Sequence, residues 1–282
     1  MTEPGQWVLT LVCDDRPGIV HAVTGAVVTA EGNITELQQF SSADGRFFLR
    51  LEVATGVTEQ ALRTSLGTAA VELGAHWRLD RAGRKIRTLV LASKAGHCLN
   101  DLLFRQRSGW LAVEVPLVLA NHPDLGGLAH FYGVPFEHHP VLPETKAAFE
   151  RRVLTAVADL DIELVVLARY MQILSPQLCQ ALAGRAINIH HSFLPGFKGA
   201  NPYRQAHARG VKLIGATAHF VTADLDEGPI IEQNVTRVDH SKSPAELVAI
   251  GQDVESRTLT EAVKLYAEHR VLLDGARTII FR

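Results

Sequence analysis

Asparagine and histidine alternate at one predicted strand end. Residues 186–189 form a short apolar-rich run, and Asn188 and His190 are two positions apart at its end. Side chains two positions apart on a strand point to the same side, so these two should project together. An amide donor beside an imidazole suits the stabilisation of a carbonyl oxygen as it becomes negative. The alternative is a pair of polar residues whose hydrogen bonds are satisfied at the strand end.

A second polar stretch follows later in the chain. A predicted strand at 213–221 contains His219, and an acidic loop comes directly after it. Asp226 in this loop could manage a proton if the fold holds it near an imidazole. Asp224 and Glu227 could instead be solvated turn residues.

These residue types narrow the chemistry. Asn, His and Asp without an accompanying Ser or Cys nucleophile point away from an acyl-enzyme intermediate. Ser192 lacks the G-x-S-x-G setting of a nucleophile elbow. The set therefore favours direct attack by water or an amine on a small acyl group.

The elements that must position these groups alternate along the second part of the chain. Strands that are apolar throughout, such as residues 164–168, are typical of a parallel sheet covered on both faces. The pattern predicts an α/β domain with a doubly wound, mostly parallel sheet, whose ligands bind beyond the carboxyl ends of the strands. The predicted strands are 86–92, 115–120, 164–168 and 186–189, and the predicted helices between them are 98–107, 146–160 and 176–182.

A long helix is predicted near the end of the chain. Ser243 can cap it, Pro244 suits its first position and Glu246 can reach back to the cap. The helix is expected to run to about residue 269 and to pack on the sheet, with its charges forming a solvated face.

The first part of the chain has a different order of elements. Strand, helix, two strands joined by Asp44 and Gly45, helix and strand give a β-α-β-β-α-β, ferredoxin-like arrangement. The basic stretch 81–85 is predicted to be a linker. The sequence thus predicts two domains, at residues 5–82 and 86–282.

The first domain resembles an ACT domain. The resemblance depends on the run D-R-P-G-I-V at residues 15–20 and on Gly32 and Asn33 after the predicted helix. ACT domains commonly bind an amino acid at the loop after the first strand, or pair with one another. The resemblance therefore implies an amino-acid effector site, a homo-oligomer, or both. Backbone amides at a helix start favour a carboxylate, although Pro17 and Gly18 could simply shape the turn. The implied effector-binding residues are Asp15, Pro17, Gly18 and Asn33.

The second domain resembles the folate-dependent formyltransferase fold. The runs N-I-H-H-S-F-L-P at 188–195 and H-F-V-T-A-D-L-D-E-G-P at 219–229 match the signatures of that family, and Y-M-Q-I-L-S at 170–175 matches the segment whose main chain lines the pterin pocket. The resemblance implies that Asn188, His190 and Asp226 are catalytic, and it gives no such role to His191. The implied folate-binding residues are Met171, Gln172, Ile173, Leu174, His219, Val221 and Asp224.

Further runs are similar to the formyltetrahydrofolate deformylase family. They are S-K-A-G-H-C-L at 93–99, S-G-W at 108–110, N-H-P-D-L at 121–125 and K-G-A-N-P-Y at 198–203. By this resemblance, the chain hydrolyses 10-formyltetrahydrofolate to tetrahydrofolate and formate, which supplies formate for one-carbon and purine metabolism and balances the folate pool. The loop after the first strand of the second domain holds a single glycine, which disfavours a phosphate nest. The chain also ends soon after the long helix, so an added nucleic-acid-binding domain is not expected.

Two alternatives stay open at this point: a formyltransferase for a small amine, and a regulatory binding protein with a retired catalytic domain. Transferase and hydrolase can share one catalytic set, so the difference lies on the acceptor side of the site. A bulky loop at 94–99 or at 197–203 could exclude an amine and admit water.

Composition excludes several other classes of protein. The 282 residues are 47% hydrophobic and 21% charged, which is ordinary for globular proteins. A net charge of −2 and a pI near 6.7 argue against binding nucleic acid by charge. No apolar run is long enough to cross a membrane, and the start lacks the features of a secretory signal. The three cysteines are widely spaced, so we expect reduced thiols, no metal site and a cytoplasmic location. The resemblance to the deformylases implies folate as substrate and no cofactor.

Overall fold

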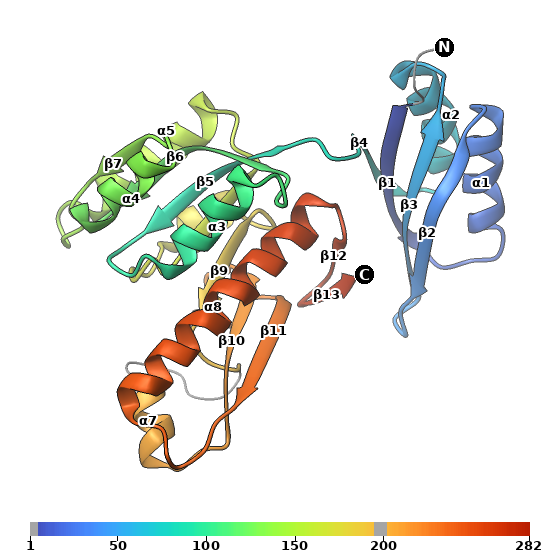
Figure 1. Ribbon diagram of the computed structural model, residues 1–282. Coiled ribbons are helices and arrows are strands. Elements are labelled where there is room, and N and C mark those ends of the chain that lie inside the picture. The colour runs from blue at the N-terminus through green and yellow to red at the C-terminus, as the bar shows by residue number, and fades with distance from the viewer. Residues whose placement is uncertain (1–4, 195–201) are drawn as a thin grey trace. The chain divides into compact units, whose positions relative to one another are not determined.

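The computed structural model describes residues 5–194 and 202–282, and the chain folds into two compact units (Figure 1). Unit 1 comprises Met1–Arg84, Glu268–Leu272 and Ile279–Arg282, and unit 2 comprises Lys85–Ala267 and Leu273–Thr278. None of the helices in the described residues is both long and apolar enough to cross a membrane.

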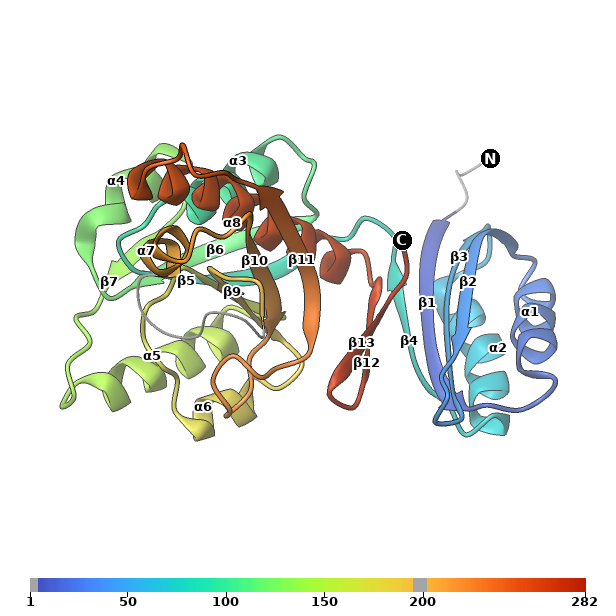
Figure 2. The same ribbon diagram turned by 90° about the horizontal axis from the view of Figure 1, so that it is seen from below.

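Unit 1 is a four-stranded antiparallel sheet with both of its helices on one face (Figure 2). The strand order is β2-β3-β1-β4. This confirms the predicted β-α-β-β-α-β arrangement. The elements are β1 (Gly5–Asp14), α1 (Ile19–Thr29), β2 (Asn33–Ser41), β3 (Arg46–Thr55), α2 (Glu59–Glu72) and β4 (His76–Arg81).

The two faces of this sheet differ in what covers them. On β3, Phe47 and Leu49 belong to the core shared with α1 and α2. Phe48 points to the opposite face, as the strand period of two requires, and packs there with Leu272 and Phe281. The second domain was predicted to include every residue up to 282, whereas 268–272 and 279–282 lie in unit 1. They do so because the apolar face that Phe48 begins needs a cover.

Charged residues continue this second face. The Arg50 side chain is 1% exposed, and its guanidinium lies 3.1 Å from a Glu36 oxygen and 2.6 Å from a Glu52 oxygen. Arg50 also donates two hydrogen bonds to the carbonyl oxygen of Glu268, and Arg270 forms an ion pair with Glu36 at 2.9 Å. A buried charge is tolerated only when it is paired in this way. The C-terminal segment of unit 1, residues 268–272 and 279–282, is thus held to the sheet by ion pairs as well as by apolar contacts.

Unit 2 is built on a seven-stranded sheet of order β11-β10-β9-β8-β5-β6-β7. The pairs from β9 through β7 are parallel, and β10 and β11 are antiparallel additions at one edge. The predicted mostly parallel, doubly wound sheet is therefore confirmed. The strands are β5 (Ile86–Ala92), β6 (Val113–Ala120), β7 (Phe136–His138), β8 (Leu164–Ala168), β9 (Ala186–His190), β10 (Leu213–Phe220) and β11 (Ile230–Arg237).

Helices cover both faces of this sheet (Figure 2). On one face lie α3 (His97–Arg107), α4 (Gly126–Phe131) and α8 (Pro244–Ala267), and on the other lie α5 (Lys146–Asp159) and α6 (Pro176–Ala181). A further helix, α7 (Pro202–Ala208), contacts α8. The predicted helix start at Ser243 is confirmed, since its backbone N–H donates to Glu246 and its hydroxyl accepts from the Glu246 N–H.

Several short elements escaped prediction because they are too short to show a period. They are the single turn η1 (Pro123–Leu125), α4, α7, β7 and the two-stranded sheet of β12 (Val271–Asp274) and β13 (Arg277–Ile280).

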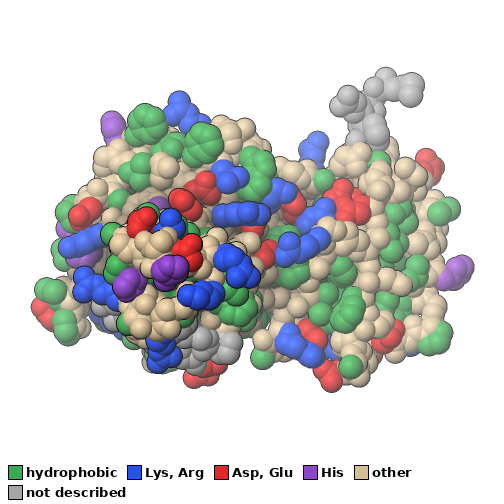
Figure 3. All heavy atoms as spheres, turned by 60° about the horizontal axis from the view of Figure 1, so that its bottom comes forward, with side chains coloured by type: hydrophobic (Ala, Val, Ile, Leu, Met, Phe, Trp, Pro, Cys, Tyr) green, Lys and Arg blue, Asp and Glu red, His purple; other side chains and the backbone are tan. Residues whose placement is uncertain are grey.

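The state of the cysteines and the mixture of surface charges are those expected from the sequence. Cys13, Cys98 and Cys179 are all buried and free, as expected. On the face drawn in Figure 3, Lys and Arg side chains lie among Asp and Glu side chains, in keeping with the small net charge.

Candidate active site

A pocket of about 580 Å³ opens at the carboxyl ends of β5, β8 and β9 in unit 2. This is the edge at which open α/β sheets bind their ligands. The residue types predicted from sequence come together here, although they lie on three separate stretches of chain. The predicted catalytic and folate-binding residues that line the pocket are Met171, Gln172, Ile173, Leu174, Asn188, His190, His219, Val221, Asp224 and Asp226.

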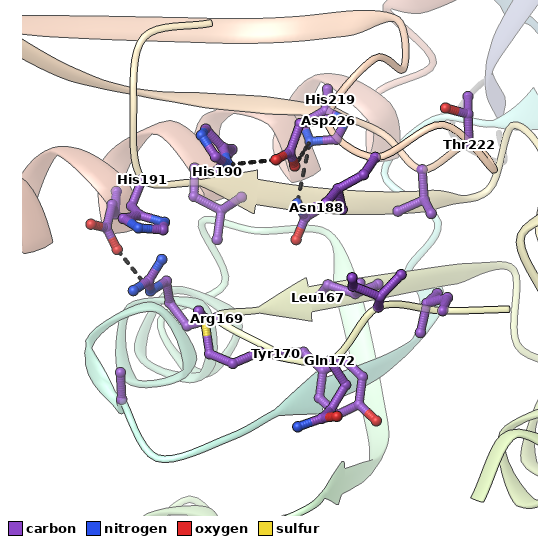
Figure 4. A pocket seen from close by; sticks show the side chains of 18 of the residues that line it. Leu167, Arg169, Tyr170, Gln172, Asn188, His190, His191, His219, Thr222 and Asp226 are labelled. Atoms are coloured by element: carbon purple, nitrogen blue, oxygen red, sulfur yellow. Dashed lines mark hydrogen bonds and ion pairs between the residues drawn. The ribbon is translucent and has the colours of Figure 1, made fainter. Parts of the chain in front are cut away.

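The pairing of β9 with β10 sets the first contact. The antiparallel register places His219 directly opposite Asn188, and Asn188 Nδ2 lies 3.2 Å from His219 Nε2. His219 Nδ1 lies 2.8 Å from the carbonyl oxygen of Phe220. Because a carbonyl oxygen only accepts, the proton of the neutral ring is on Nδ1, and Nε2 accepts one N–H of Asn188. Figure 4 shows the Asn188 oxygen directed away from His219.

The loop between β10 and β11 delivers Asp226. Gly228 lies so close to β10 that an added Cβ would stand 1.7 Å from the Phe220 carbonyl oxygen, so only glycine fits there. Asp226 itself has φ of 58°, in the left-handed region that Asp and Asn tolerate better than most residues. The acidic loop is thus folded tightly back on β10, which turns Asp226 toward the two histidines.

Asp226 contacts both imidazoles (Figure 4). Its Oδ2 lies 3.2 Å from His190 Nδ1, and its Oδ1 lies 3.7 Å from His219 Nε2. The hydrogen bond with His190 is the largest cause that lowers the pKa of Asp226 far below its usual value, against the effect of burial. Asp226 is therefore an ionised acceptor, and His190 Nδ1–H donates to it.

This pairing leaves the other nitrogen of His190 available. His190 Nε2 is fully buried, and it has no hydrogen-bond partner within the described part of the chain. A buried polar atom without a partner carries a desolvation cost that a bound water or substrate oxygen can remove. His190 Nε2 is thus the atom at which this site can take up or deliver a proton.

One side of the pocket is formed by the segment after β8. The backbone N–H of Met171 donates to Ser93 Oγ at 2.9 Å, and Ser93 donates to Asn121 Oδ1 at 2.7 Å. At the other end of the segment, Ser175 begins α6 as its N-cap. The side chains of Met171 and Ile173 remain more than half exposed between these anchors. The result is a fixed main chain with an open apolar surface, suited to a flat ring.

The pocket is also lined by Arg169 and Glu255, which the sequence pattern did not identify. Glu255, on α8, is 1% exposed and accepts hydrogen bonds from His97 Nε2 at 2.8 Å and from Tyr203 Oη. Arg169 Nε lies 3.1 Å away as an ion pair, but its N–H is not aimed at the carboxylate. Burial alone raises the pKa of Glu255, but the His97 hydrogen bond, the Arg169 charge and Tyr203 together leave it lowered.

The prediction of a solvated charged face on α8 is therefore wrong at Glu255. The signal was present in the spacing, because Leu247, Gly251 and Leu259 are buried at intervals of four and Glu255 completes that stripe. A carboxylate on the buried stripe of a helix must have partners inside the fold.

Two features of this region could in principle bind a metal or act as a nucleophile: the group of His97, Cys98 and Glu255, and the thiol of Cys179. One ligand atom each of His97, Cys98 and Glu255 lie within 4.8 Å of one another, which is a distance a metal could bridge. Burial raises the pKa of the Cys98 thiol well above its usual value, and Glu255 is already paired with a cation, so this set does not suit a metal. Cys179 also lines the pocket, but burial raises the pKa of its thiol, which makes it a poor nucleophile.

Of the two loops expected to exclude an amine, 94–99 is described in full and 197–203 only in part. Ala95 and His97, from the stretch 94–99, line the pocket, as does Tyr203. Residues 197–201 of the other stretch lie outside the described residues, as does Pro195 of the signature run 188–195. His191 also lines the pocket, with its ring centroid 5.2 Å from that of His190.

The implied effector residues do not gather in one place. Asp15, Pro17 and Gly18 form the exposed loop between β1 and α1. Asn33 pairs with Ala54, which in turn pairs with Gln6 at the opposite end of β1. Eight residues of strand separate the two places, about 26 Å. Within one copy of unit 1, Asn33 therefore cannot share a small ligand with that loop.

Comparison with known proteins agrees with this fold. The model of the formyl transferase family matches residues 86–263, and the model of the ACT domain matches residues 7–64. The class of the chain is therefore a formyltransferase-fold catalytic unit preceded by an ACT domain.

Full-length relatives narrow this class. The chain is 48% identical to the formyltetrahydrofolate deformylase of Corynebacterium sp. (strain P-1), over 100% of both chains. It is 39% identical to that of Escherichia coli (strain K12), over 97% of each. The crystal structure of the formyltetrahydrofolate deformylase from Burkholderia mallei is 49% identical, with a TM-score of 0.95 over 99% of this chain and 100% of that one. The chain belongs to the formyltetrahydrofolate deformylase family.

Proposed function

We infer that this chain is a hydrolase that converts 10-formyltetrahydrofolate and water to tetrahydrofolate and formate. The observation that carries this is the His190 imidazole, which an ionised Asp226 holds at Nδ1 while Nε2 stays buried and unpartnered among the described residues. Such a group activates water directly. The likeness to the deformylases over the whole chain supports the same reaction.

The first step is attack of water on the formyl carbon. Water loses a proton to His190 Nε2 as its oxygen bonds to carbon, and the carbonyl electrons move to the formyl oxygen. Asp226 has too low a pKa to be the effective base itself, so it acts by stabilising the imidazolium that forms. Asn188 gives one N–H to His219 and has a second N–H with which to donate to the developing oxyanion.

The second step is expulsion of the folate nitrogen. The tetrahedral intermediate collapses, the carbon–nitrogen bond breaks, and the nitrogen takes the proton that His190 Nε2 holds. Formic acid then loses its proton to solvent. The segment 171–174, with Val221 and Asp224, would hold the pterin, since its anchored main chain and apolar side chains lie next to the catalytic set.

The direct test is to measure formate released from 10-formyltetrahydrofolate with no acceptor added. Formate and tetrahydrofolate should appear in equal amounts. A formyltransferase for a small amine would release formate only negligibly until an amine is supplied, and a retired catalytic unit would release none at all.

We also propose a regulatory role for the ACT domain. An amino-acid effector at the loop of Asp15, Pro17 and Gly18, a homo-oligomer, a cytoplasmic location and a role in supplying formate for purine synthesis stay predictions. Gly18 has φ of 94° and precedes α1 without a side-chain cap, so the first backbone N–H groups of α1 remain open to a carboxylate. Titrating glycine and methionine against the full-length enzyme tests the effector, and a response to neither would leave assembly as the proposed role.

A further inference from the structure

His97, Arg169, Tyr203 and Glu255, called the Glu255 cluster below, line the same pocket as Asn188, His190 and Asp226. Figure 4 shows Arg169 of this cluster near His191, Gln172 of the segment 171–174 farther along the pocket, and Asn188 and His190 across the pocket from both. With the folate held against the segment 171–174, the part of the pocket lined by the Glu255 cluster is the part left for a nucleophile. Four elements supply the cluster there: His97 begins α3, Arg169 follows β8, Tyr203 lies on α7 and Glu255 on α8.

The cluster is closed by its own contacts. His97 and Tyr203 both donate to Glu255, and Arg169 balances its charge, so the carboxylate has its partners within the protein. Arg169 adopts φ of 58°, an uncommon conformation for a residue with a side chain. Such a conformation persists only where the surroundings enforce it.

Tyr203 lies against α8 only because of a glycine. A Cβ added at Gly251 would stand 2.2 Å from the Tyr203 Oη and Cζ atoms. Gly251 lies one helical turn before Glu255, so its missing side chain makes the space through which the Tyr203 ring reaches that carboxylate. The helix thus accepts a glycine in its interior, at some cost in helix propensity, in exchange for this contact.

We propose that His97, Arg169, Tyr203 and Glu255 form an acceptor wall that determines the specificity of the reaction for water. The wall fills the acceptor side with bulky, already paired side chains. An amine and the carbon skeleton attached to it cannot approach the formyl carbon, whereas water can. This inference rests on the proposed hydrolysis and identifies what makes the site a hydrolase rather than a transferase.

The test is a partition experiment with glycinamide, a small primary amine that is partly unprotonated near pH 8. Formate and N-formylglycinamide are measured together, for the wild type and for the double variant His97→Ala/Tyr203→Ala, which retains the Arg169–Glu255 pair. We expect the ratio of formyl amide to formate to rise at least tenfold in the variant, with saturation in glycinamide. A ratio equal to that of the wild type would overturn the proposal.

Three further variants separate volume from other effects. Tyr203→Phe removes only the hydroxyl and should keep the wild-type ratio, because the ring still fills the wall. Gly251→Ala should raise the ratio, since it displaces the ring without touching the ring itself. Met171→Ala shortens a side chain of the proposed folate-binding segment and should change folate affinity while leaving the ratio as it is. A rise in the ratio for Met171→Ala that matches the double variant would contradict a specific wall.

The design also keeps the two claims apart. Formate release by the wild type without glycinamide tests the hydrolysis, and only the ratio tests the wall. A wild type that formylates glycinamide as fast as it releases formate would refute the wall even though the enzyme is active. If the double variant does not fold, as judged by its thermal transition, the ratios of Tyr203→Ala and Gly251→Ala decide the question.

Discussion

Two carboxylates, Asp226 and Glu255, face the same pocket and are used differently. Both accept from a histidine and both have a lowered pKa. Asp226 is partly exposed on a loop, and the histidine that it holds keeps a buried nitrogen without a described partner. Glu255 is enclosed on a helix and satisfied by three side chains at once.

The difference lies in which hydrogen-bonding capacity is left over. The unused nitrogen of the His190 imidazole can take up or give a proton. The unpartnered Nε of Arg169 belongs to a guanidinium that stays protonated, so the Glu255 cluster can only occupy space and fix its neighbours. Burial and a lowered pKa are shared by the two sites, so neither property by itself marks the catalytic group. The predictions below separate the two carboxylates.

The largest effect is expected for Asp226→Asn. The substitution keeps the shape and suits the left-handed backbone but removes the charge that stabilises the His190 imidazolium. Turnover should fall by about 10²–10⁴, the usual contribution of positioned acid–base groups. Folate binding and the urea midpoint should change little. Near-normal turnover in the folded variant would remove Asp226 from the mechanism.

Glu255→Ala should show the opposite profile. It leaves Arg169 as a partly buried cation without its counter-charge, and it leaves His97 and Tyr203 without their acceptor. Breaking a buried pair in this way costs about 3–5 kcal/mol of unfolding free energy. Urea denaturation of the variant beside Asp226→Asn provides the measurement. Equal stability of the two variants would show that the cluster does not support the fold.

Asn188→Ala and His190→Ala test the other two members of the catalytic set. Asn188→Ala removes one oxyanion donor, which typically costs about 10²–10³ in rate. His190→Ala removes the proton carrier, and a positioned acid–base group typically contributes about 10²–10⁴. The double variant should lose less than the product of the two factors, because the groups act as a unit. Single-turnover rates with saturating substrate give the comparison, and strict multiplicativity would mean that the two residues act independently.

A third histidine–carboxylate pair, His269 and Asp80 in unit 1, predicts how the stability of the protein depends on pH. His269 Nδ1 lies 3.7 Å from Asp80, yet burial lowers the pKa of His269 to about 4 and outweighs that carboxylate. The unfolded chain, with a histidine pKa near 6.5, binds the proton first as pH falls. Stability should therefore be full above about pH 6.5 and should decline by about 3 kcal/mol as pH falls to 4.

His269→Asn tests this dependence, because Asn suits the φ of 55° at that position. The variant should lose much of the decline in unfolding free energy between pH 6.5 and 4. The remainder is expected from His191, whose pKa burial also lowers to about 4, and from carboxylates with a lowered pKa such as Asp226 and Glu255. His21→Asn, at an exposed histidine of the same unit, is the matched control and should retain the wild-type slope. A slope unchanged by His269→Asn would rule out this group as its source.

The smallest effect is expected for His191→Ala. The lowered pKa, which comes from burial and then from Arg169, leaves this ring neutral at pH 7, so it supplies no charge to the oxyanion. Turnover should fall by less than about tenfold, below the range of a positioned proton carrier. Should His191→Ala prove more harmful than His190→Ala, the roles assigned along β9 would have to be exchanged.

The sequence by itself determined what depends on local spacing. Apolar runs and turn residues located the long strands and helices of both units, and the two-residue spacing of Asn188 and His190 placed both at the pocket. The resemblance of residues 219–229 to a known family directed attention to Asp226. These features are readable because a strand or helix repeats its pattern every few residues.

The tertiary structure decided what depends on partners far apart in the chain. Only the folded chain shows that Glu255 meets His97 and Arg169, since 158 residues separate Glu255 from His97. Only the strand register separates Asn33 from the loop at Asp15, and only packing assigns the C-terminal segment to unit 1. Each of these follows from burial that must be satisfied, and the chain's periodicity does not specify which distant groups satisfy it.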